Sequence, residues 1–292
     1  MLKIVLFCKS YVGDLKRFQR FWDSLHRYNK DKIPFYACVP ESDLKIFKEE
    51  IKNSDLINWV TDQEVVEVSP GGNKEIYRNL NPSLSQQIIK AEVWRVLDVE
   101  NYVCFDSDSV VIRDISINDF LSPDGSPYTV LHQHKIFWEL SLKRSDKYLN
   151  NYLELSERIK HFFDRTGPNY SFGPTPCIWS KYVWKDLYEK TLKPSGKSFW
   201  DAIIEIPSEI IWYGETILEH RSIPLIPIDP LMKAYLYPWQ LKGSYKLPKK
   251  ELAKIYIGVV YQSNWEFELN YIEKKKFFSR VLRSLKRFLK TI

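Results

Sequence analysis

The residues best suited to chemistry are Asp106 and Asp108, which follow an apolar run in the segment VENYVCFDSDSVVIR, residues 99–113. Side chains two residues apart in an extended chain point to the same side, so both carboxylates can reach one cation beyond the end of a strand. Such oxygen ligands suit Mg²⁺ or Mn²⁺, which keep coordination positions open for water or phosphate oxygens. We therefore predict a metal site for a nucleotide diphosphate. The alternative is a turn in which the aspartates accept local backbone hydrogen bonds.

The elements that must position these aspartates alternate between strand and helix over the first 115 residues, which predicts a parallel sheet covered by helices. Short apolar runs predict strands over residues 3–8, 35–39 and 57–60, before the strand that ends at the aspartates. Apolar residues at helical spacing predict helices over residues 13–29, 44–51 and 83–98. Ser83 and Gln86 fit a capping box for the last of these helices. Ligands of open α/β sheets bind beyond the carboxyl ends of the strands, where this order places the aspartates.

Composition limits the class of protein. The 292 residues can form one large domain or two small ones, and 15% aromatic residues indicate a compact globular chain. No run of about 18 apolar residues occurs, so no membrane-spanning helix is predicted. The first residues, MLKIVLFCKS, fit a buried strand better than a signal peptide. The cysteines are scattered without a C-x-x-C pair, which favours reduced core residues of a cytoplasmic protein: Cys8, Cys38, Cys104 and Cys177.

Beyond residue 115 the alternation is less regular. An amphipathic helix is predicted over residues 145–163, followed by the loop GPNYSFGPTPCIWS at residues 167–180. No internal repeat or low-complexity linker separates the two halves. We therefore expect one domain with an elaborated C-terminal portion and an appended tail.

Several segments carry a family resemblance: KSYVGD at 9–14, SLSQQIIKAEVWRVL at 83–97, FGPTPCIWSK at 172–181 and PSEIIWYGETIL at 207–218. Arranged in this order around Asp106 and Asp108, they resemble GT-A type glycosyltransferases. The resemblance is closer still to a bacterial family of largely uncharacterised transferases with an Asp-x-Asp motif. It implies a Rossmann-like GT-A fold, α/β, with a mixed sheet flanked by helices. Residues 1–115 would bind the nucleotide sugar and residues 116–270 the acceptor.

The resemblance also implies an activity, the transfer of a sugar from a nucleotide-sugar donor to a glycan or lipid-linked acceptor in cell-surface polysaccharide or lipopolysaccharide assembly. Mn²⁺ or Mg²⁺ would bridge Asp106, Asp108 and the diphosphate. GT-A enzymes often take a further ligand from a C-terminal histidine, but no histidine follows His220 here. Gln262, Asn264 or water are the alternatives.

Two glutamates are candidates for the base that an inverting transfer needs, Glu209 and Glu215. We favour Glu209, although it follows Ser208, a plausible N-cap, and can simply complement the helix dipole. Glu215 follows Gly214, which permits a close backbone approach or a bend. A retaining mechanism stays open.

Candidate nucleotide-sugar contacts lie after the predicted strands and on the helix before the aspartates: Lys9, Ser10, Asp14, Asp62, Gln87, Lys90, Asp106 and Ser107. Asp14 can equally cap a helix, and Asp62 can have a turn role. Gln87 and Lys90 share a helix face that would ordinarily be solvated, so their assignment depends on the resemblance.

Candidate acceptor or sugar contacts lie in the second half of the chain: His132, Thr175, Trp179 and Tyr213. His132 and His134 alternate as on a strand, although a histidine satisfied by its protein neighbours is the commoner case. Trp179 and Tyr213 can stack on sugar rings or fill a core.

Residues 271–292 have the pattern of a basic amphipathic helix, with phenylalanine and leucine on one stripe and lysine and arginine around it. We predict that it binds an anionic membrane surface, which would place the enzyme on the inner face of the membrane; docking on the protein's own core is the alternative. The tail explains most of the net charge of +6, so no nucleic-acid partner is invoked.

Two other functions remain as alternatives. A phosphohydrolase of the haloacid dehalogenase type also places Asp-x-Asp at a strand end, and Val110 fits its motif. Such enzymes usually carry it on the first strand, with a later acidic pair that is not found after residue 108. The second alternative is a membrane-surface carbohydrate-binding protein without catalytic activity.

Overall fold

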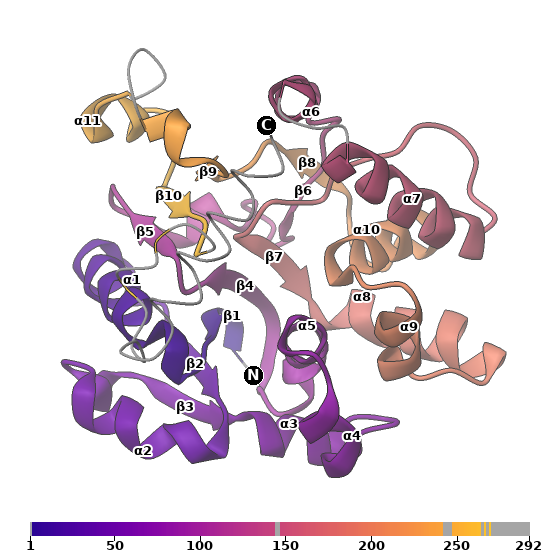
Figure 1. Cartoon of the computed structure of the whole chain (residues 1–292), viewed down its shortest axis with the longest axis horizontal. Helices are drawn as coiled ribbons and strands as arrows, with labels where there is room; N and C mark the ends of the chain where they lie inside the picture. The colour runs from indigo at the N-terminus through magenta and orange to yellow at the C-terminus, as the bar shows by residue number, and fades with distance from the viewer. Residues whose placement is uncertain (1, 144–146, 242–246, 264–265, 267–268, 270–292) are drawn as a thin grey trace, which may run out of the picture.

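The computed structural model describes residues 2–143, 147–241, 247–263, 266 and 269. Over these residues, helices flank a central mixed sheet (Figure 1). In its spatial order the sheet contains β3 (Asn58–Thr61), β2 (Phe35–Val39), β1 (Leu2–Lys9), β4 (Val99–Asp106) and β7 (Cys177–Ser180). The first four strands are parallel, and β7 is antiparallel to β4. The predicted α/β fold with a mixed sheet flanked by helices is confirmed.

The chain order of the sheet reverses at β1, which pairs with β2 on one side and β4 on the other. Lys9, the last residue of β1, lies opposite Asp106, the last residue of β4. A reversal of this kind leaves a crevice beyond the carboxyl ends of the two strands, where α/β proteins bind ligands. The first aspartate of the motif therefore lies at the switch point of the sheet.

Two apolar layers cover the sheet because successive side chains of a strand point to opposite faces. On β1, Ile4 and Leu6 pack on one side and Val5 and Phe7 on the other. The Ile4 side is covered by α1 (Leu15–Tyr28) and α2 (Glu41–Glu50). The Val5 side is covered by α3 (Asp62–Val68), α5 (Pro82–Glu92), α8 (Lys181–Asp186), α9 (Phe199–Glu205) and α10 (Glu209–His220).

Two smaller sheets extend the fold. In one, β10 (Gly258–Tyr261) lies between β5 (Ser109–Val111) and β9 (Met232–Tyr235). In the other, β6 (Tyr128–Val130) pairs with β8 (Ile226–Ile228). The other α-helices of the described residues are α4 (Lys74–Asn79), α6 (Lys135–Leu142), α7 (Lys147–Phe162) and α11 (Lys249–Leu252). Because β5 follows Asp108 directly, its pairing with β10 brings the segment after residue 258 to the aspartates.

Most predicted elements of the first half are confirmed: β1, β2, α1 and β4 occur where the apolar patterns placed them, and β3 is shifted by one residue. The predicted 145–163 helix corresponds to α7. The capping box of Ser83 and Gln86 is wrong, because Asn81 is the N-cap and accepts a hydrogen bond from the Ser83 N–H at 3.0 Å. The helix ends at Glu92 and continues as a 3₁₀ turn over Val93–Arg95.

All four cysteines are buried free thiols, as predicted. Among the described helices, none is both long and apolar enough to cross a bilayer. The predicted amphipathic helix over 271–292 and the candidate ligand Asn264 lie outside the described residues.

Candidate active site

Asp106 is held from two sides at the end of β4. Lys90 Nζ on α5 lies 2.5 Å from its Oδ1, and Thr175 Oγ1 donates to its Oδ2 at 2.6 Å. Burial alone would raise the pKa of Asp106, but the Lys90 charge and these hydrogen bonds outweigh it and lower the pKa. The side chain is still 32% exposed. Asp106 is therefore an ionised carboxylate that a ligand can reach.

Asp108 lies in the turn between β4 and β5, so the extended geometry expected from the sequence ends at Asp106. The backbone N–H of Ser263 donates to Asp108 Oδ2 at 2.9 Å, and that of Tyr261 donates to the Asp108 carbonyl at 3.0 Å. Oδ1 is buried and has no hydrogen-bond partner among the described residues. Burial, followed by the neighbouring Asp106 charge, raises the pKa of Asp108 to about 7. Among the described residues, the Asp108 carboxylate therefore lacks a paired cation that would stabilise its ionised form.

This donor set fits a hard cation. Asp108 Oδ1 is an orphaned oxygen, and the oxygens of Asp106 keep lone pairs beyond those used by Lys90 and Thr175. Within the described residues, no group of three or more His, Cys, Asp or Glu side chains is placed to hold a metal. Gln262, a predicted alternative ligand, lies between the two residues whose N–H groups hold Asp108. Water or substrate oxygens would have to complete the coordination of any ion.

Lys90 also connects Asp106 to Glu209. Its Nζ lies 3.9 Å from Glu209 Oε1, and the lysine and glutamate side chains are only 6% and 10% exposed. Burial would lower the pKa of Lys90, but Asp106 and then Glu209 raise it well above its usual value. Burial raises the pKa of Glu209, and Lys90 only partly opposes this. The site therefore contains a permanent cation beside a carboxylate with raised proton affinity.

The start of α10 fixes Glu209. The Ser208 side chain accepts a hydrogen bond from the Ile211 N–H at 3.3 Å, so the predicted N-cap is confirmed. Gln87 Oε1 on α5 accepts a hydrogen bond from the Glu209 N–H at 3.2 Å. Gln87 thus positions the backbone of Glu209, while Lys90 of the same helix approaches its carboxylate.

Asp14 and Ser107 lie on the side of the site nearest α1. Ser107 Oγ donates to Asp14 Oδ2 at 3.2 Å, and Arg17 Nη1 lies 2.6 Å from Asp14 Oδ1. Arg17, with a side chain only 1% exposed, also donates to the carbonyls of Ser263 and Glu266 at 3.2 and 2.5 Å. Arg17 was not predicted from the sequence, although an arginine beside Phe18 on the apolar face of a helix was a usable signal. It ties the segment that holds Asp108 to the first loop.

Lys9 and Asp62 form a buried ion pair at 3.0 Å, with side chains 7% and 0% exposed. Cys38 Sγ donates to Asp62 Oδ1 at 3.2 Å, and the Tyr77 hydroxyl donates to Oδ2. Ser10, beside Lys9, is 2% exposed. Lys9, Ser10 and Asp62 are therefore buried, and their contact with a nucleotide stays a prediction.

The predicted acceptor residues separate into two groups. Thr175 contacts Asp106, and His132 Nε2 donates a hydrogen bond at 2.6 Å to the Gly173 carbonyl in the same loop. Trp179 and Tyr213 are instead 1% and 2% exposed and pack against one another in the core, with ring centroids 5.8 Å apart. The sugar-contact prediction for these two aromatic residues is not supported, because burial leaves them no open ring face.

Two other expectations need correction. His134 does not continue a strand with His132: its φ of 52° is left-handed, and it precedes α6. Glu215 forms a two-point ion pair with Arg165, with Arg165 Nη2 at 2.7 Å from Oε1, and its side chain is 2% exposed. The helix α10 therefore brings Glu209 to Lys90 and directs Glu215 to a structural pair.

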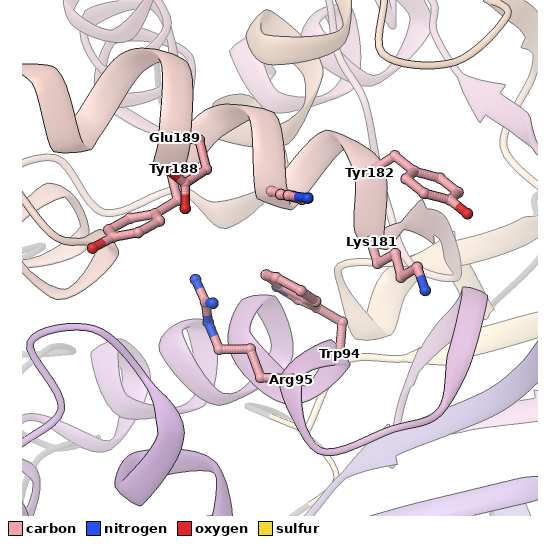
Figure 2. Close-up of a pocket in the computed structure, with 7 residues that line it drawn as sticks. Trp94, Arg95, Lys181, Tyr182, Tyr188 and Glu189 are labelled. Carbon is pink, nitrogen blue, oxygen red and sulfur yellow. The ribbon is translucent and has the colours of Figure 1, made fainter. Parts of the chain in front are cut away.

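A cavity of about 1010 Å³ opens beside this cluster. Gly173 and Pro174, next to Thr175, and Ser208, next to Glu209, line one part of it. A smaller pocket of about 370 Å³ lies where Trp94 and Arg95 extend toward the helical segment that carries Tyr188 and Glu189 (Figure 2). It is near the amino end of β4, roughly 20 Å from Asp106 by strand length. Of the two, the larger cavity is the one lined by sequence neighbours of Thr175 and Glu209.

The family model described as Family of unknown function (DUF6492) matches residues 1–219. The chain belongs to this family. No curated protein matches the sequence of this family member.

Solved glycosyltransferase structures show a distant similarity to this DUF6492 chain. Mouse xyloside xylosyltransferase 1, apo form, aligns with a TM-score of 0.49 and 10% identity over 89% of this chain and 98% of its own. The galactosyltransferase LgtC, in complex with donor and acceptor sugar analogues, aligns with a TM-score of 0.49 and 10% identity over 94% and 99%. The WbbM bifunctional glycosyltransferase, apo, gives 0.48 and 9% over 89% and 46%.

Proposed function

We propose that the chain is a metal-dependent glycosyltransferase of the GT-A type, which transfers a sugar from a nucleotide-sugar donor to a hydroxyl of a glycan or lipid-linked acceptor. The main support for this proposal is the position of Asp106. It ends β4 opposite the end of β1, at the switch point of the sheet, with Asp108, Lys90, Thr175 and the Glu209 carboxylate around it. This is where an α/β sheet binds a nucleotide, and two carboxylates there suit a metal diphosphate.

Asp106 and Asp108 would hold the metal. When bound, Mn²⁺ or Mg²⁺ would stabilise negative charge on the departing diphosphate. Thr175 and Lys90 keep Asp106 ionised and orient its oxygens. The Lys90 ammonium also has donors beyond the one used on Asp106, which can contact donor phosphate.

Glu209 is the proposed base, and the transfer is proposed to invert the anomeric carbon. The acceptor oxygen forms a bond to that carbon as its bond to the donor phosphate breaks, and the electron pair leaves on the nucleoside diphosphate. Glu209 takes the acceptor proton. Its raised proton affinity suits this role, and Gln87 and Ser208 hold it at the start of α10 beside the larger cavity.

The biological process and the location of the protein are proposed from the sequence. A role in cell-surface polysaccharide or lipopolysaccharide assembly follows from the family resemblance, and attachment to the inner membrane face follows from the basic pattern of residues 271–292. Nucleotide contacts from Lys9, Ser10, Asp14 and Asp62 belong to the same proposal.

Turnover tests this function. Purified protein is incubated with a panel of nucleotide sugars and Mn²⁺ or Mg²⁺, and released nucleotide is measured. We expect metal-dependent release from one donor, lost in Asp108→Asn and kept in Asp55→Asn, which removes a carboxylate from an exposed turn. Phosphate release from simple phosphomonoesters without donor cleavage would instead favour the phosphohydrolase. Donor binding without cleavage would favour the carbohydrate-binding protein.

A further inference from the structure

The larger cavity combines positive charge with apolar walls. Its positive part contains Lys135 at the start of α6 and Lys233 on β9, with the side chains of His132 and His134 in the same lining. Its apolar part is formed mainly by residues between β8 and β10: Leu231, Met232, Ala234, Leu236, Ile255 and Ile257. Ser208 and Pro174 connect both parts to the neighbours of Glu209 and Thr175. A ligand that fills the cavity therefore meets cations and an apolar surface, next to residues that adjoin the proposed catalytic cluster in the chain.

Among the described lining residues of this cavity, positive side chains outnumber negative ones. Neither Lys135 nor Lys233 has an ion-pair partner within the described part of the chain. Arg113 also lines the cavity but is paired with Asp119 at 2.7 Å. Asp229 is the only carboxylate among the described lining residues. The surroundings thus favour an anion.

His132 and His134 lie close together in the lining of this cavity. Their ring centroids lie 4.4 Å apart. Burial, then His132, then Lys233 lower the pKa of His134 to about 4, because a further positive charge is disfavoured there. A phosphate group would be stabilised at this position, since lysine binds phosphate as a compact charge with three donors.

The apolar wall continues to the surface. Ile255, at one end of it, is 70% exposed, the largest exposure among the large hydrophobic side chains of the described residues. Leu231 and Met232 lie deeper, and Met232 is 1% exposed. An apolar chain that follows this wall would cover Ile255 and gain free energy in proportion to the area removed from water.

We propose that the cavity binds the acceptor, and that this acceptor is a sugar joined through phosphate to an apolar chain. The inference rests on the proposed glycosyltransferase function and names its acceptor class. Lys135 and Lys233 bind the phosphate, the wall from Leu231 to Ile255 binds the chain, and the sugar hydroxyl lies toward Glu209.

Calorimetric titration of the full chain, without any nucleotide sugar, tests the proposal with three probes: farnesyl phosphate, farnesol and inorganic phosphate. We expect farnesyl phosphate to bind at least about tenfold more tightly than either part alone. Lys233→Gln or Lys135→Gln should weaken it by about tenfold or more, because each removes a charge-assisted contact. Ile255→Ser should weaken farnesyl phosphate and leave inorganic phosphate unchanged.

Two control variants distinguish loss of the binding site from a general effect on the protein. Lys185→Gln removes an exposed lysine from the smaller pocket and should leave binding unchanged. Lys233→Arg keeps the charge and should retain most of the affinity, which separates charge from folding; thermal melting checks each variant.

Equal binding of farnesol, equal binding of inorganic phosphate, or no binding of farnesyl phosphate would each overturn the inference. Donor cleavage without farnesyl phosphate binding overturns this inference alone. Specific binding of farnesyl phosphate without cleavage of any nucleotide sugar overturns the proposed function and still supports the proposed ligand class.

Discussion

The ammonium group of Lys90 lies 2.5 Å from Oδ1 of Asp106, in an ion pair whose lysine side chain is 6% exposed. This pair joins the helix before the motif to the strand that carries it. Replacing Lys90 leaves a partly buried carboxylate without its cation, so the pKa of Asp106 should rise.

We expect Lys90→Gln to lower the free energy of unfolding by about 2 kcal/mol, measured by denaturant titration. The double-mutant cycle with Asp106→Asn should show a coupling of about 1 to 3 kcal/mol. Additive effects of the two substitutions would contradict the pairing.

Glu209 and Glu215 provide a matched comparison on one helix. Glu209→Gln should lower turnover by about 10²- to 10⁴-fold, because it removes the proposed base, while its melting temperature stays close to that of the unmodified chain. Glu215→Gln should instead leave turnover close to that of the unmodified chain. It should lower the free energy of unfolding by about 3 kcal/mol, because Arg165 loses a buried partner. If both variants lost turnover in the same proportion to their loss of stability, the result would count against Glu209 as the base.

Gly214 is required by packing. A Cβ at this position would lie 2.1 Å from ring atoms of Phe172, which belongs to the loop that carries Thr175. Gly214→Ala should destabilise the chain by about 1 to 3 kcal/mol or displace the loop. Thermal unfolding measures the first effect and nucleotide release the second. An alanine variant that matches the parent in both would show that the ring moves aside freely.

His134 should make stability depend on pH. Its pKa is about 4 in the folded chain and near 6.5 when unfolded. Above pH 6.5 both states are neutral at this site, and below it the unfolded chain binds a proton first. The free energy of unfolding should therefore fall from pH 6.5 toward pH 4.

The control for this prediction is His134→Asn, which suits the left-handed backbone of residue 134 and does not titrate. Its stability should fall less than that of the parent over the same pH range. Parallel pH profiles for the two chains would contradict the assignment.

Local sequence patterns predicted the first half of the fold well, because buried strands and amphipathic helices there have clear periodicity. The pattern of Leu15, Phe18, Trp22 and Leu25 gave α1, and the apolar runs gave β1 and β4. The short helices α3 and α4 were missed. The capping box of Thr61 and Glu64 was the available signal for α3.

The site was predictable only in part. Asp106 and Asp108 follow from a strand that ends at two carboxylates. The contact between Thr175 and Asp106 joins residues 69 positions apart and depends on the tertiary fold. The burial of Trp179 and Tyr213 was equally inaccessible, because an aromatic side chain on a short strand or a helix has the same sequence signal in a core or at a ligand.

The metal-nucleotide site is tested by the equilibrium binding of nucleoside diphosphates, namely UDP, GDP, CDP, ADP and TDP, with Mn²⁺ or with EDTA. We expect that one diphosphate binds with Mn²⁺, that EDTA abolishes this binding, and that Asp108→Asn abolishes it while Asp55→Asn does not. Equal binding with EDTA or by Asp108→Asn, or no binding of any diphosphate, would contradict a metal-nucleotide site at Asp106 and Asp108.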